Sequence, residues 1–219
     1  NGLYRTIFQP NETYGKDAYV WAGASTTNYD DSYLKIGFEP TLEYFSFLEF
    51  NLTSLVQLSP LITVLDSSLT LVTDGGDLTT SAGIYIPDYG WEETGVTYNN
   101  MPSYGSEIGL QAISGSEQSL VYNLANFVNR VKGWINGSYS NNGVVIIREG
   151  TQFGDSHVKN LYSSGESVSS KRPKLIVDYQ IKSARVNFSV NGFSQGVYAW
   201  NCRAYDIYGD SNFAISNRT

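Results

Sequence analysis

Cysteine, histidine and methionine are almost absent from this chain of 219 residues, which contains one of each. The single cysteine, Cys202, excludes an intrachain disulfide, and its place on an apolar strand predicts a small buried residue rather than a nucleophile. The single histidine, His157, excludes a zinc site built from paired histidines. No run of about 18 apolar residues occurs, so the sequence predicts no membrane-spanning helix.

Charged residues are also scarce, at 16%, and the acidic ones outnumber the basic ones by 21 to 14, for a net charge of −7. The longest basic cluster is Lys171-Arg172, and a surface of this kind repels phosphate backbones, so we expect no nucleic-acid partner. The polar surface must consist mainly of Ser, Thr, Asn, Gly and Tyr. Neutral polar surfaces are common outside the cell, and we expect an extracellular or cell-surface location.

The N-terminal residue is Asn1 and the only methionine is Met101, which favours a chain processed by removal of a signal peptide. A fragment of a longer protein is the alternative. Five sequons of the form Asn-x-Ser/Thr provide candidate glycosylation sites in an exported protein, at Asn11, Asn51, Asn136, Asn187 and Asn217.

Short apolar runs separated by turn residues dominate the sequence. They predict strands over residues 17–22, 44–50, 61–65, 69–72, 84–86, 144–147 and 175–179. Strands at this spacing without long helices between them predict an all-β fold, a jelly-roll-like antiparallel β-sandwich. Residues 123–135 differ, because their apolar side chains follow helical spacing. They predict one short helix with Asn123 as its N-cap and Gly137 just after its end.

A separate group of strands is predicted in the last 39 residues, 181–219, over residues 185–191, 196–206 and 212–217. So few residues can hardly bury the apolar faces of three strands alone. Residues 1–12 form a strand-like arm ahead of the sandwich. The hypothesis is strand exchange, in which the arm of one subunit completes the fold of the next and builds a filament. The alternative is that the arm and the tail pack on their own sandwich.

Apolar side chains of the arm and the tail are the candidate subunit contacts. They are Leu3, Tyr4, Ile7, Phe8, Val186, Phe188, Val190, Tyr198, Trp200, Phe213 and Ile215.

Several motifs occur in a fixed order, among them FLEFNL (47–52), VTYN (96–99) and RPKLIVDY (172–179). Over residues 13–180 the chain resembles the DNRLRE domain, a β-sandwich module of archaeal and bacterial surface and secreted proteins. That domain is related to disaggregatase-type proteins and to an alginate-binding carbohydrate module family. Ser46 stands where the family usually has Arg, so no role of that Arg carries over. The tail, residues 181–219, resembles the late strands of immunoglobulin-like repeats in archaeal surface proteins.

The stretch WEETGVTYNNMPSYG (91–105) is the densest run of distinctive residues. Glu92 and Glu93 would point to opposite faces of a strand, a poor arrangement for a paired acid and base. We therefore interpret the stretch as a corner of the fold. A sugar-binding platform is the alternative, since four aromatic rings could stack on sugars: Tyr89, Trp91, Tyr98 and Tyr104.

Other sites have weaker signals. Asp17, Asn28, Asp30 and Asp31 could bind Ca²⁺, although ordinary turn chemistry is the interpretation we favour. His157 follows Asp155 in what we expect to be a solvated loop. We predict no metal, no cofactor and no enzymatic activity.

The functional hypothesis is a glycosylated structural subunit that polymerises with copies of itself into a surface filament or layer. The alternative is a carbohydrate-binding module that anchors a surface protein to polysaccharide. A third hypothesis is a polysaccharide-active enzyme that uses Glu92, Glu93 or His157.

Overall fold

The computed structural model describes residues 2–10, 15–40, 42–75, 79–150 and 157–182. Beyond residue 183 it describes residues 192, 194–197, 199, 203–205 and 211–213. The chain divides into two units, Asn1–Ser183 and Ala184–Thr219. The sequence placed this boundary three residues earlier, after residue 180.

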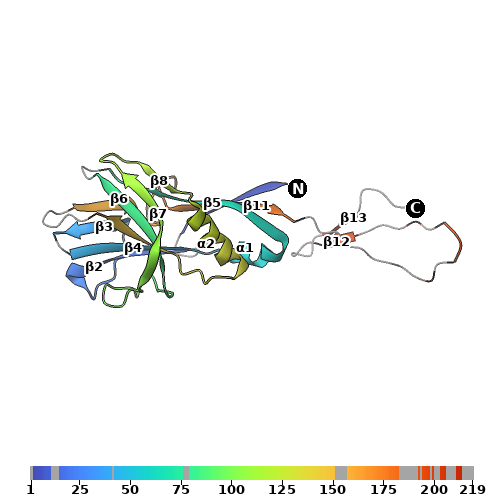
Figure 1. The fold of residues 1–219 in the computed structure, drawn as a ribbon, viewed down its shortest axis with the longest axis horizontal. Coiled ribbons are helices and arrows are strands. Elements are labelled where there is room, and N and C mark those ends of the chain that lie inside the picture. Colours follow the sequence, from blue (N-terminus) through green and yellow to red (C-terminus); the bar gives the residue numbers. More distant parts are fainter. Residues whose placement is uncertain are drawn as a thin grey trace. The chain divides into compact units, whose positions relative to one another are not determined.

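Two antiparallel sheets make up the first unit (Figure 1). The four-stranded sheet has the order β1-β11-β5-β8, with bounds Leu3–Phe8, Lys174–Ile181, Ile62–Val72 and Ser119–Tyr122. The seven-stranded sheet has the order β10-β3-β4-β9-β6-β7, with β2 also paired to β4. In chain order its strands are β2 (Gly15–Trp21), β3 (Tyr33–Glu39), β4 (Leu42–Phe50), β6 (Thr80–Pro87), β7 (Tyr104–Ile113), β9 (Val144–Glu149) and β10 (His157–Tyr162). The predicted all-β sandwich is confirmed.

The main core lies between the two sheets, because alternate residues of each strand point inward. Leu69 and Leu71 of β5 and Val177 of β11 are buried there. Helix α2 (Ala125–Asn136) lies against β5 and β7 (Figure 1). Its apolar stripe belongs to the same core: Phe127, Val131, Trp134 and Ile135.

Helix α2 begins two residues later than predicted. Its N-cap residue is Leu124 and not Asn123, whose amide donates a hydrogen bond to Asp66 Oδ2 on β5 (3.2 Å). Gly137 follows the last turn with φ of +80°, as expected of a glycine that ends a helix. A second helix, α1 (Thr53–Leu58), was not predicted, since six residues are too few for a helical period to stand out. Two 3-10 turns, η1 (Ala22–Ala24) and η2 (Ser59–Leu61), complete the helical elements described.

A second apolar cluster lies on the opposite face of the seven-stranded sheet. Phe45 and Phe47 alternate along β4 with residues of the main core and so point to the other side. The connection between β6 and β7 covers them with Trp91 and Val96, which are both buried. The stretch 91–105 is therefore a corner of the fold that covers this face.

The expected N-terminal arm is part of the sandwich of its own chain. Strand β1 pairs with β11 from Leu3↔Gln180 to Phe8↔Leu175. Arg5 Nε donates to Asp178 Oδ1 (2.7 Å) and Arg5 Nη2 donates to Asp178 Oδ2 (2.8 Å). Packing on its own sandwich was the alternative to strand exchange, and β1 has this arrangement, with Phe8 partly buried against the main core. Leu3 and Ile7 stay largely exposed, at 70% and 55%.

In the second unit, β12 (Arg203–Tyr205) pairs antiparallel with β13 (Ser211–Phe213). The backbone of Phe213 is thus on a strand. The other candidate contacts of the tail lie outside the described residues, as does Cys202, and the immunoglobulin-like character of this unit stays a prediction. Val186, Phe188, Val190, Tyr198, Trp200 and Ile215 are these candidates.

Gly37 lies on β3 where this strand pairs with β4 on one side and β10 on the other. Its φ is +127°, and an added Cβ would collide with the carbonyl oxygen of His157 on β10. We predict that Gly37→Ala lowers the free energy of unfolding by about 2 kcal/mol in urea titrations. Gly105→Ala is the control, because no atom lies within 4 Å of the Cβ it would add. Equal loss in both variants would contradict the prediction.

Candidate functional site

An open cleft of about 740 Å³ lies beside the corner formed by residues 88–105. One side comes from the end of β6 and the residues after it, 86–90, and another from the start of β7. Helix α2 contributes Arg130, and the connection from α2 to β9 contributes Tyr139, Ser140 and Asn142. The cleft thus combines segments that are far apart in the sequence.

Asp88 and Tyr89 form a wall that is fixed from behind by residues 101–103. The backbone N–H of Asp88 donates to the Ser103 carbonyl (2.8 Å), and Ser103 Oγ donates to Asp88 Oδ2 (2.7 Å). The Tyr89 hydroxyl donates to the Met101 carbonyl (3.2 Å), while its side chain remains 53% exposed. Both functional groups are therefore oriented before any ligand arrives.

Tyr139 and Arg130 form a second wall. The Arg130 guanidinium lies 4.3 Å from the centre of the Tyr139 ring, within the range of a cation–π contact. Tyr139 N donates to the carbonyl of Gly133 (3.2 Å), and a Cβ on Gly133 would collide with the ring. Gly133 in the middle of α2 is thus explained by the ring that lies on it. The Tyr139 side chain is 51% exposed.

Asn142 connects the cleft to the second apolar cluster. The side-chain amide of Asn142 donates to the Pro87 carbonyl (3.1 Å), and the backbone carbonyl of Asn142 accepts from the indole N–H of Trp91 (3.1 Å). Exposed aromatic rings together with amide, hydroxyl and charged groups can bind a ligand that has both apolar faces and many hydroxyls. A pyranose ring has this chemistry.

The structure brings one of the four predicted platform aromatics into the cleft, Tyr89. Trp91 is only 4% exposed and lies in the second apolar cluster, where Tyr98 and Tyr104 pack around Phe45. Sequence reasoning missed Tyr139, Arg130 and Asn142. The helical spacing of residues 123–135 places Arg130 on a helix and Tyr139 just after it. Nothing in the sequence indicates that these two residues lie in the same cleft as Tyr89.

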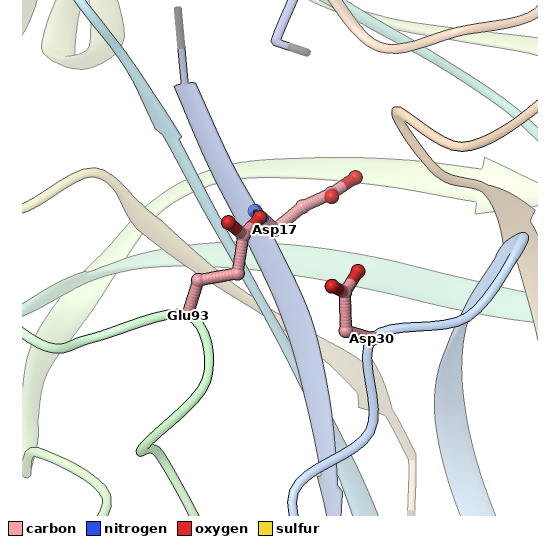
Figure 2. Close-up of side chains that lie close together, drawn as sticks. All are labelled: Asp17, Asp30 and Glu93. Carbon is pink, nitrogen blue, oxygen red and sulfur yellow. Dashed lines mark hydrogen bonds between the residues drawn. The ribbon is translucent and has the colours of Figure 1, made fainter. Parts of the chain in front are cut away.

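An acidic cluster lies at the edge of the same corner. Asp17, Asp30 and Glu93 each have an oxygen atom within 4.8 Å of the others (Figure 2). Asp17 is 1% exposed, and its carboxylate accepts from the backbone N–H and the hydroxyl of Ser164, both at 2.6 Å. Glu93 Oε1 accepts from the backbone N–H of Asp17 (2.8 Å). These oxygens could hold a cation, although several of them already serve to tie loops to β2.

Two of the four residues considered as calcium ligands, Asn28 and Asp31, are engaged elsewhere, in agreement with the favoured interpretation of turn chemistry. The Asn28 amide donates to the carbonyls of Glu93 (2.6 Å) and Val96 (2.8 Å), and Asp31 accepts from the Tyr19 hydroxyl (3.1 Å). Their contacts are those of ordinary loop anchoring.

The pKa of Asp17 is raised to about 6. Burial is the largest cause, because it disfavours the charged form, and the negative charges of Glu93 and Asp30 raise the pKa further. The hydrogen bonds from Ser164 act in the opposite direction and lower it.

The candidate enzymatic residues do not come together in the cleft. Glu92 and Glu93 lie at the start of a turn and not on a strand, and Glu92 is exposed. His157 is the first residue of β10, paired with Phe38, and is half-buried, so the expectation of a solvated loop was wrong.

Among the glycosylation candidates, Asn51 and Asn136 are exposed. Asn51 Oδ1 accepts from the hydroxyl of Thr53 (2.6 Å), the third residue of its sequon. Asn11, Asn187 and Asn217 lie outside the described residues. Among the helices described, none is long and apolar enough to cross a membrane.

A β-sandwich with an open cleft lined by tyrosines, an arginine and an amide has the form of a ligand-binding module. Residues 10–179 match the family model of carbohydrate-binding module family 96, and the chain belongs to that family. No curated protein matches the chain. A similar solved structure is titled "Structure of infectious bursal disease virus Gx strain". It is 12% identical, with 82% of this chain and 36% of that chain covered, and its TM-score of 0.16 is too low to carry an argument.

Asp17 is expected to make the protein more stable in mild acid than at neutral pH. The unfolded chain releases this proton near the ordinary value of 3.8 and the folded chain near 6, so the folded state binds more protons between these values. The free energy of unfolding should therefore fall by roughly 2 kcal/mol as the pH rises from about 4 to about 6.5. Urea titrations at several pH values measure this change.

Asp17→Asn should remove most of this pH dependence, whereas Asp66→Asn on β5 should preserve it. A wild-type chain that gains stability over the same pH range contradicts the assignment. We further expect a calcium chelator to leave the melting temperature unchanged, because Ser164 already satisfies both oxygens of Asp17.

Proposed function

We propose that this chain is an extracellular module that binds polysaccharide in the cleft lined by Tyr89 and Tyr139. Membership of a carbohydrate-binding module family over residues 10–179 is the observation that carries the proposal. The cleft adds a place for it, since it offers exposed rings and fixed polar groups in a volume suited to a few sugar residues. Carbohydrate-binding modules are usually extracellular or at the cell surface, which agrees with the expected location.

Binding would divide between the rings and the polar groups. The tyrosine rings supply flat apolar surface for the C–H faces of pyranose rings. Asn142, Asp88 and Arg130 supply hydrogen bonds to hydroxyls. Because Ser103, Met101 and Gly133 already hold these walls in place, little conformational entropy is lost on binding.

The cleft is suited to binding rather than hydrolysis. Glycoside hydrolysis requires a pair of carboxyl groups on either side of one bond. Asp88 is the only carboxylic acid among the described residues that line the cleft. Glu93 is on another part of the corner and accepts a hydrogen bond from Asp17 N.

Assembly of this module into a surface filament, with glycans on exposed sequons such as Asn51 and Asn136, is a second proposal. Strand β1 favours it, since it is an edge strand that exposes Leu3 and Ile7. Its pairing with β11 of the same chain opposes strand donation by residues 1–12. A strand from another subunit that pairs with the outer edge of β1 would be consistent both with the exposure of this edge strand and with its pairing to β11.

Replacing either cleft tyrosine is expected to weaken polysaccharide binding. We predict that Tyr89→Ala and Tyr139→Ala each raise the Kd about 10-fold, because each removes roughly 1.4 kcal/mol of stacking. Isothermal titration with a soluble glycan that the wild type binds measures this. Tyr4→Ala is the matched control, since Tyr4 is an exposed tyrosine on β1 that does not line the cleft. Equal weakening in the control would contradict the assignment of the cleft.

Deleting residues 1–10 tests how β1 is used. If β1 stays in its own sheet, the dispersed chain should lose an edge strand and melt roughly 5–10 °C lower. If β1 is exchanged between subunits, the deletion should abolish polymers seen by electron microscopy and leave the melting temperature of dispersed chains unchanged. Polymers that survive the deletion contradict strand donation by this segment.

A further inference from the structure

Strand β1 has an open outer edge. It is the first strand of the four-stranded sheet, and among the described residues only β11 pairs with it. Its pairing with β11 has no register shift, and its six residues include neither proline nor glycine. Its one charged side chain, Arg5, is bound to Asp178 of the same chain. Strand β1 therefore has few of the features that keep an edge strand from pairing with another chain.

The other edge strands of the first unit are protected. Strand β8 is only four residues long. On the free side of β2, Tyr19 N donates to the carbonyl of Tyr29 (3.0 Å), and β10 is bridged at Leu161 to Thr73. Strand β7 contains two glycines and pairs irregularly with β6 at two places. Short length, cover and irregular pairing all oppose the addition of a strand, so β1 is the edge at which we expect it.

Strand β1 also leaves apolar surface in solvent. The exposed fractions of Leu3, Ile7 and Tyr4 are 70%, 55% and 44%. Side chains alternate along a strand, so the even-numbered residues face the main core, where Phe8 is packed, and the odd-numbered residues face the opposite side. A partner strand must match this alternation to cover the apolar residues.

A second copy of β1 satisfies that requirement. Two identical antiparallel strands are related by a two-fold axis perpendicular to the sheet, so residues opposite each other are both even-numbered or both odd-numbered. An axis at Arg5 would place two guanidinium groups opposite each other, which is destabilising. An axis at Thr6 places Thr6 opposite its own copy and Tyr4 opposite Phe8 of the second chain. Arg5 then lies opposite Ile7. Threonine pairs and aromatic pairs are favourable in such positions, which selects the axis at Thr6.

A groove beside the end of β1 agrees with this register. Its volume is about 360 Å³, and its lining is formed by Ile7, Phe8, Gln9, Asn51, Thr53 and Ser54. With the axis at Thr6, Tyr4 of the second chain lies opposite Phe8 and therefore next to this groove. The exposed part of the Tyr4 ring would be covered there, and the two-fold axis repeats the contact in the other chain.

We propose that two copies of this chain pair through β1, antiparallel and with Thr6 opposite Thr6, so that their four-stranded sheets become continuous. The partner of the exposed edge is thus a second copy of the chain. The contact goes beyond polysaccharide binding and does not depend on it. Pairing of two identical edges closes after two copies, so a filament would require a further contact. Because six-residue edges form a small interface, we expect a dimer Kd on the order of 10–100 µM.

Cysteine cross-linking tests the pairing in the whole chain. Cys202→Ser removes the native thiol, and Thr6→Cys then places one thiol opposite its copy. Opposite Cα atoms of antiparallel strands are about 4.5–5.5 Å apart, a distance that a disulfide spans. We expect mild oxidation at about 200 µM chain, above the expected Kd, to give mainly a disulfide-linked dimer. Ser119→Cys in the same background is the matched control, an exposed serine on β8 at the other edge of the sheet, and should stay monomeric.

Substitutions of Ile7 test the register without a covalent bond. Ile7 would lie opposite Arg5 of the second chain, and its exposed side chain can be replaced without disturbing the core. Ile7→Glu should dimerise about 10-fold more tightly than Ile7→Lys, since each charge pair occurs twice. General repulsion between chains of net charge −7 acts in the opposite direction, because lysine reduces that charge. Sedimentation velocity measures both Kd values, and thermal melting verifies that both variants are folded.

Each contrary outcome overturns a defined part of the proposal. A wild-type chain that stays monomeric at about 200 µM, with no cross-linking of Thr6→Cys, overturns the dimer. Cross-linking of Ser119→Cys as readily as Thr6→Cys overturns the assignment to β1. Ile7→Lys that dimerises as tightly as Ile7→Glu overturns the register. None of these outcomes affects the polysaccharide-binding function, because β1 and the cleft share no residue and binding is measured separately.

Discussion

Burial of Trp91 against the seven-stranded sheet is the interaction on which the corner and the cleft both depend. Its ring centre lies 5.5 Å from that of Phe47, and its indole N–H donates to the Asn142 carbonyl. Lys16 Nζ donates to the Trp91 carbonyl from β2 (2.6 Å). One residue thus joins β2, β4, the connection after β6 and the turn before β9. Removing it would expose apolar surface and release the segments that carry the cleft walls.

The corner covers the second apolar cluster and at the same time carries one wall of the cleft. Covering Phe45 and Phe47 requires the chain to leave β6, cross the face of the sheet and return at β7. Asp88 and Tyr89 occupy the start of that crossing, where the chain is exposed and where residues 101–103 can hold it. The cleft is therefore positioned by an apolar cluster that lies next to it, and rigid support of this kind favours binding without rearrangement.

Local patterns predicted much of the fold. Alternation of apolar residues located β2, β4, β9 and β11, and helical spacing located α2 to within two residues. Residues 61–65 and 69–72 were predicted as two strands but form one, β5, because the polar residues 66–68 between them continue the pairing with β11. Strand β7 was missed, since Gly105, Gly109 and its alternating polar residues lack a strong apolar signal.

The sequence by itself determined the fold class, the single long helix, the lack of disulfides and the negative charge, because these follow from composition and from periods of two and 3.6 residues. It also marked residues 91–105 as a corner. The tertiary structure alone decided which residues share a surface. Tyr89 meets Arg130 and Tyr139 only because two sheets and α2 pack together, and β1 joins β11 across more than 160 residues of chain. Such pairings depend on the sum of many long-range contacts, and no local pattern encodes them.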